Sequence, residues 1–123
     1  EVEVYLEADD FAGLCEEAGR ALAELMLGEA VEESDQIETI SVEGSDRTML
    51  LFNWLNELIF RSELDKLVFT DFEVVELTDQ RLVVRTHGVE PASIRTAVKA
   101  ATFHRLAVDE SPDGLEGTVV FDV

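Results

Sequence analysis

Carboxylate oxygens near the end of the sequence are the groups best placed to do chemistry. Residues 118–123 alternate in the manner of a strand, with Val119 and Phe121 on one face and Asp122 on the other. If this strand is held in a sheet, the Asp122 carboxylate and the terminal main-chain carboxylate of Val123 lie close together at its tip. Two such groups repel each other unless a cation lies between them, and Ca²⁺ prefers oxygen ligands. The pattern suggests a divalent-cation site, the alternative being a solvated chain end that carries an Asp.

A second group of polar side chains lies in residues 96–108, which we expect to form a strand. It contains Lys99, Thr102 and His104 in a sequence otherwise poor in basic residues. In a regular strand Lys99 and His104 point to opposite faces, because successive side chains alternate. His104 has apolar neighbours on its face, so by default it is a core or edge histidine. Lys99 is by default an ion-pair partner of little energetic weight.

The usual catalytic signatures are absent from the sequence. It contains no Gly-rich phosphate loop, no Gly-x-Ser-x-Gly elbow, no His-Glu-x-x-His and no Cys-x-x-Cys. With one Cys and two His, a zinc site cannot be argued from spacing. A hydrolase using Asp122 and His104 as an acid–base pair would lack an identifiable nucleophile. The residues by themselves therefore identify no enzyme class.

The acidic composition limits the class of partner. Nine Lys and Arg residues against 28 Asp and Glu give a net charge of −19. Because nucleic-acid affinity comes largely from cationic contacts, direct binding to RNA is not expected. The acids are spread over the whole chain, which favours a halophile-like adaptation to molar salt over the alternative, a docking surface for a basic protein.

Length and hydropathy predict one cytoplasmic domain, residues 1–123. A chain of 123 residues that is 46% hydrophobic can bury one core without metals or disulfides. It has no apolar run of about 18 residues, so we expect no membrane span. The lone Cys15 cannot form an internal disulfide, which suits a reducing compartment. Because the sequence does not begin with Met, we expect the natural chain to begin a few residues earlier.

Hydrophobic periodicity predicts alternating strands and helices followed by a run of strands. Strands are expected at 1–7, 37–42, 67–77, 81–87, 96–108 and 115–122, and helices at about 11–27 and 46–61, with a polar connection at 29–36. The order β-α-β-α-β-β-β-β predicts an α/β (α+β) sandwich in which two helices pack on a mixed, mostly antiparallel sheet.

Local signals refine the two helices. Asp9 or Asp10 is expected to cap the first helix and Gly28 to end it, and Ser45 can cap the second. Cys15 and Trp54 fall on apolar helix faces, so both are predicted to be core residues.

Three separated segments are similar to one known family. Residues 98–106 resemble the VKAxTYHxL segment of the archease family, with Phe103 in place of the Tyr. Residues 50–59 resemble its LLxxWLNELL helix, and residues 119–123 match its terminal VVFD followed by one aliphatic residue. The segments occur in the family's order and span most of the chain.

The resemblance implies a protein cofactor, not a stand-alone enzyme. Such a cofactor activates an RtcB-type RNA ligase in tRNA splicing, promoting its guanylylation and its multiple turnover. It also implies a divalent cation, Ca²⁺ in known members, bound by a penultimate Asp, the terminal carboxylate and an Asp of an N-terminal HTAD motif. The first two correspond to Asp122 and Val123. The alternative function is a small acidic calcium-binding or chaperone-like module with no ligase partner.

The third metal ligand departs from the family pattern. Aligned without gaps through the first strand, Glu1 occupies the place of the motif's Asp, and the preceding His-Thr-Ala is missing. A rival alignment sets Glu7-Ala8-Asp9 against the motif but deletes the strand before the helix. Glu is also an oxygen ligand, although its extra methylene moves the carboxylate outward.

The acidic composition makes a prediction about salt. If the charge is an adaptation to molar salt, the protein will lose stability at low ionic strength, because repulsion among its acids is no longer screened. Thermal melting followed by circular dichroism in dilute buffer and in several molar KCl measures this. Equal melting temperatures in the two buffers would rule out salt adaptation.

Overall fold

The computed structural model of the chain describes residues 1–28 and 36–123, so most of the predicted polar connection at 29–36 lies outside the described residues. The predicted order of strands and helices is confirmed. The elements are β1 (Val2–Ala8), α1 (Phe11–Leu27), β2 (Gln36–Glu43), α2 (Arg47–Asp65), β3 (Val68–Leu77), β4 (Arg81–Val89), β5 (Ala100–Ser111) and β6 (Gly114–Asp122).

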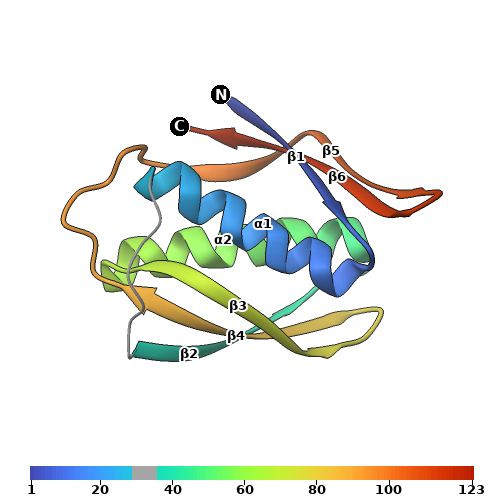
Figure 1. The fold of residues 1–123 in the computed structure, drawn as a ribbon, viewed down its shortest axis with the longest axis horizontal. Coiled ribbons are helices and arrows are strands. Elements are labelled where there is room, and N and C mark those ends of the chain that lie inside the picture. The colour runs from blue at the N-terminus through green and yellow to red at the C-terminus, as the bar shows by residue number, and fades with distance from the viewer. Residues whose placement is uncertain (29–35) are drawn as a thin grey trace.

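The strands form two three-stranded antiparallel sheets rather than one mixed sheet. One has the order β1-β6-β5 and the other β2-β4-β3. The two helices lie between them, as Figure 1 shows: α1 packs on β1 and β3, and α2 packs on β5 and β2. The fold is therefore an α+β sandwich with a helical layer at its centre.

Short-range chemistry explains where the helices begin and end. The Asp10 carboxylate accepts a hydrogen bond from the Gly13 N–H at 2.7 Å, which satisfies one of the free donors at the start of α1. Gly28 ends that helix with a φ of 79°, a conformation that glycine adopts without steric cost. In α2 the cap is Asp46, which accepts from Met49 N–H at 2.9 Å, and not the preceding Ser45.

The core is centred on Trp54 of α2, as predicted. Its side chain is fully buried, and its indole Nε1–H donates to the Cys15 main-chain oxygen of α1 at 2.9 Å. The ring meets that of Phe72, on β3, edge-on with centroids 5.9 Å apart. One side chain thus joins both helices and a strand.

Two asparagines attach α2 to the two sheets. Asn56 donates from Nδ2 to the Ala101 main-chain oxygen at 3.1 Å and accepts from the Ala101 N–H at 3.0 Å, so it binds both backbone groups of one β5 residue. One turn earlier, Asn53 donates to the Glu43 oxygen at the end of β2, at 2.7 Å.

Neither helix carries an apolar stretch long enough to cross a bilayer, within the part of the chain described.

Replacing Asn56 by Ala should lower the free energy of unfolding by about 2–3 kcal/mol, because it leaves two part-buried backbone groups of Ala101 without partners. Urea denaturation measures the change. Asn53→Ala is the matched control: it removes one exposed hydrogen bond and should cost about 1 kcal/mol or less. Equal losses for the two variants would contradict a special role for Asn56.

Cys15 is predicted to be unreactive in the folded protein. Burial raises the pKa of its thiol from 9.0 to about 12, with the Glu16 charge adding to the effect. Alkylation by iodoacetamide at pH 8 should therefore be about 1,000-fold slower than in urea, because the thiolate is the reacting form. Since the unfolded thiol ionises near pH 9 and the folded one near 12, this group also lowers stability as the pH rises through that window. Rapid alkylation without unfolding would contradict the burial.

Candidate functional site

The last strand, β6, is the middle strand of its sheet, and this determines how its tip is held. On one side Phe121 pairs with Val2 of β1, and on the other Asp122 pairs with Ala100 of β5. Lys99 immediately precedes β5, and its main-chain N–H donates to the Asp122 main-chain oxygen at 2.8 Å, which extends the ladder by one more bond. The β6 backbone is therefore paired on both sides as far as Phe121 and on the β5 side as far as Asp122, while the Asp122 side chain is exposed.

The three predicted metal ligands lie at this tip. Glu1 precedes Val2, whose partner is Phe121, so antiparallel register places Glu1 opposite Asp122. Val123 follows Asp122 and is 38% exposed. Figure 1 shows the two chain ends near each other, where β1 begins and β6 ends. That the tip binds an ion stays a prediction.

The carboxylates at the tip could bind a cation only if other ligands complete its coordination. Within residues 1–28 and 36–123, no group of three or more His, Cys, Asp or Glu side chains is placed to hold a metal. Bound through one oxygen each, the two side-chain carboxylates and the main-chain carboxylate of Val123 would supply about three of the six to eight oxygens that Ca²⁺ takes. Water or a second protein would have to supply the rest.

The segment that carries Lys99, Thr102 and His104 is not one regular strand. The predicted strand at 96–108 begins four residues later, at Ala100, and Lys99 precedes it. Thr102 donates from Oγ1 to the Val120 oxygen at 3.1 Å. The next four β5 residues, 103–106, then stand opposite a single β6 residue, since Thr102 pairs with Val120 and Ala107 with Thr118.

This bulge changes where its side chains lie. Arg105 has a φ of 55°, in the left-handed region that residues with a Cβ seldom adopt. His104 is exposed on an edge strand, which excludes the core alternative considered for it. The alternation assumed for a regular strand therefore does not apply to His104.

Arg105 crosses the central strand and reaches β1. Its Nη1 contacts Glu3 Oε2 at 2.9 Å, and Glu3 pairs with Val120 across the ladder. A side chain of β5 that reaches β1 must pass over β6, the strand of Val120, which is only 2% exposed. The Tyr5 hydroxyl donates to Glu3 Oε1 at 3.1 Å, and this bond raises the pKa of the Tyr5 phenol.

Three residues that position the tip were not found from the sequence. Arg105 and Glu3 connect the outer strands of the sheet, and Asn56 holds Ala101, next to the partner of Asp122. Of these three residues, only Asn56 stands out in the sequence, because it is an amide on a helix that is apolar around most of its circumference. Nothing in the sequence pattern indicates the bulge that brings Arg105 to Glu3.

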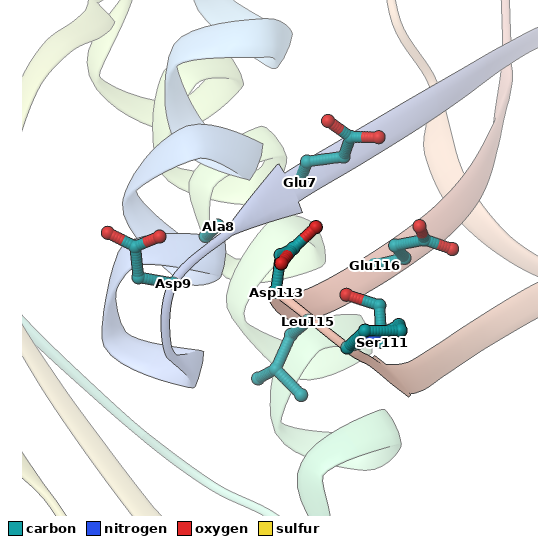
Figure 2. A pocket seen from close by; sticks show the side chains of 8 residues that line it. Glu7, Ala8, Asp9, Ser111, Asp113, Leu115 and Glu116 are labelled. Atoms are coloured by element: carbon teal, nitrogen blue, oxygen red, sulfur yellow. The ribbon is translucent and has the colours of Figure 1, made fainter.

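A second gathering of carboxylates lies at the opposite end of the β1–β6 ladder (Figure 2). Glu7 and Glu116 are cross-strand partners, and with Asp9 and Asp113 they line an opening of about 330 Å³. Within residues 1–28 and 36–123, the side chains at this end form no metal-holding group either. This end contains Glu7 and Asp9, which the rival alignment set against the family motif, but it lies away from Asp122 and Val123 at the other end of the ladder.

Comparison with solved structures supports the fold. A crystal structure from Thermotoga maritima, described as an archease and possible chaperone, superposes with a TM-score of 0.72 at 20% identity, covering 100% of this chain and 91% of that one. The solution structure of protein 1598 of Methanobacterium thermoautotrophicum superposes with a TM-score of 0.77 at 24% identity, covering 98% and 89%. At these identities the likeness shows the fold alone.

Comparison of sequences shows the family. The model of the Archease protein family matches residues 1–123. A protein archease of Methanopyrus kandleri is 40% identical over 115 residues, covering 87% of this chain and 81% of that protein. One from Pyrococcus abyssi is 33% identical over 101 residues, covering 76% and 71%. The resemblance of the three sequence segments is thereby confirmed, and the chain belongs to the archease family.

Proposed function

We propose that this protein is a cytoplasmic activator of an RtcB-type RNA ligase in tRNA splicing, and that it promotes ligase guanylylation and multiple turnover. It acts through a divalent cation, Ca²⁺ or one of similar chemistry, held at the tip formed by Glu1, Asp122 and Val123. Membership of the archease family supports a role as a protein cofactor. The observation that carries the proposal is the central position of β6, which holds Asp122 in place while leaving its carboxylate exposed.

Three groups at the tip supply oxygen ligands, and a fourth holds the backbone that carries one of them. Asp122 and the main-chain carboxylate of Val123 supply two ligands, and Glu1 on the neighbouring strand supplies a third. The Lys99 N–H fixes the main chain of Asp122 at 2.8 Å, so the carboxylate starts from a defined backbone. When bound, a divalent cation supplies positive charge that neutralises phosphate oxygens during nucleotidyl transfer.

An open ligand set suits a cofactor that works on another protein. A closed cage would bury the ion, whereas three carboxylates at an exposed tip leave coordination positions for groups of the ligase. The net charge of −19 adds to this, because a strongly acidic protein associates faster with a basic, RNA-handling partner.

Replacing Asp122 by Ala should reduce stimulation of ligase guanylylation by about tenfold or more, because the tip loses a ligand that no other side chain replaces. The rate of guanylylated-ligase formation from GTP measures this. Asp113→Ala, which removes an exposed carboxylate at the far end of the ladder, is the matched control and should stimulate normally. Both variants should melt like the wild type, since exposed positions contribute little to stability. Undiminished stimulation by Asp122→Ala would eliminate the metal-tip mechanism.

The alternative, a small calcium-binding or chaperone-like module without a ligase partner, is favoured by the description of the Thermotoga maritima relative as a possible chaperone. Pull-down with the cognate ligase, together with multiple-turnover assays, separates the two functions. The activator binds the ligase and accelerates its turnover. A protein that binds Ca²⁺ but neither binds nor accelerates the ligase fits only the alternative.

A further inference from the structure

The outward side of α2 carries a row of apolar side chains that the proposed tip mechanism does not use. Phe52, Phe60 and Leu64 belong to one four-residue row along the helix, with half-buried Asn56 between the two phenylalanines. Phe60 is 59% exposed and Leu64 is 65% exposed. We call Phe52, Phe60, Leu64 and Phe103 the apolar ridge.

Phe103 extends the ridge onto the neighbouring sheet. The bulge in β5 directs its ring onto that of Phe52, with centroids 3.9 Å apart and planes 15° from parallel, yet its side chain stays 62% exposed. Single exposed apolar residues are ordinary on a protein surface, whereas contiguous ones mark an interaction site. Here the same irregularity that carries Arg105 to Glu3 also carries an aromatic ring to α2.

The ridge runs toward the carboxylate tip. Asn56 contacts Ala101 and Phe52 contacts Phe103, so α2 advances along β5 in the direction of Lys99. Phe60, one turn beyond Asn56, therefore lies toward the end of β5 where Ala100 pairs with Asp122. Figure 1 shows the last turns of α2 and the two chain ends in the same half of the molecule.

Charge indicates what kind of surface covers the ridge. The exposed acids Glu63 and Asp65 border the far end of the ridge, and Glu1 and Asp122 lie at the tip. These four acids outnumber the two exposed cations in the same regions, Lys66 and Lys99. Arg61 in the same helix is paired with Glu57 at 2.9 Å. A second copy of this chain would bring another net charge of −19 against this rim, which opposes self-association. An apolar surface rimmed by Lys and Arg complements it.

We infer that the apolar ridge is the docking surface for the same RtcB-type ligase, an inference that rests on the proposed function, and that the ligase covers it with an apolar patch rimmed by basic residues. A single protein covers both features because the ridge leads to the tip along one side of the molecule. The ridge supplies affinity, while the tip supplies activation. The two properties are therefore separable by mutation.

The test compares the double variant Phe60→Gln/Leu64→Gln with Ile37→Gln. Gln keeps the net charge and favours helix, so α2 is retained. Ile37, on β2 of the other sheet, is 58% exposed and serves as the matched control. The Kd for the purified cognate ligase, measured by calorimetry, should rise about 30-fold for the double variant and stay unchanged for the control. Phe103→Gln should raise it about tenfold, because the ring at the bulge is lost.

Further readouts separate docking from activation. The double variant should bind Ca²⁺ like the wild type and should reach wild-type stimulation of guanylylation at saturating concentration. Asp122→Ala should show the reverse pattern, with wild-type Kd and lost stimulation. Melting curves should be the same for all four variants, because their mutated side chains are more than half exposed or lie at the solvated tip.

Three outcomes would overturn the inference. If the wild type binds the ligase and the ridge variants bind with the same Kd, the docking surface lies elsewhere and the proposed function stands. If the wild type neither binds nor stimulates the ligase, the proposed function fails and the docking inference fails with it. If the wild type forms dimers that Phe60→Gln/Leu64→Gln abolishes, the occupant of the ridge is a second copy.

Discussion

The architecture depends on one constraint: no strand of one sheet pairs with a strand of the other in the described residues, so the helical layer must join them. The Trp54 indole, bonded to the Cys15 oxygen, ties the helices to each other. The Asn53 and Asn56 amides then connect α2 to a strand of each sheet. A helix in this position needs apolar residues around most of its surface, and two of its polar residues, Asn53 and Asn56, bind main-chain groups of the neighbouring strands.

The tip is a consequence of where the last strand lies in its sheet. A terminal strand at a sheet edge would fray, but β6 is paired on both sides as far as Phe121 and with β5 as far as Asp122. The Arg105–Glu3 contact closes over it from outside, and Thr102 adds a bond to the Val120 oxygen. Exposed ion pairs contribute little to stability, so the value of this one is that it keeps the two outer strands in a fixed relation around the tip.

The β5 bulge allows a different side-chain contact on each face of its sheet. On the outer face it brings Arg105 to Glu3, and toward the helices it stacks Phe103 on Phe52. Bulges interrupt pairing and re-aim side chains, and this one stands at an edge strand, where interruption also discourages pairing with another chain. The same bulge thus contributes both to the Arg105–Glu3 contact between the outer strands and to the apolar ridge.

Local chemistry in the sequence was enough to limit the start of α1 to a cap at Asp9 or Asp10 and to place its end at Gly28. It was also enough to predict the burial of Cys15 and Trp54 and the alternation that leaves Asp122 outside and Phe121 inside. Each of these depends on neighbours within a few residues, which hydrophobic periodicity and capping rules describe. Only the tertiary structure decided that the strands divide into two sheets, that β6 lies in the middle of one, that residues 103–106 bulge, and that Asn56 binds Ala101. These features join residues far apart in the chain, and periodicity records which face of a strand is buried but not which strand lies beside it.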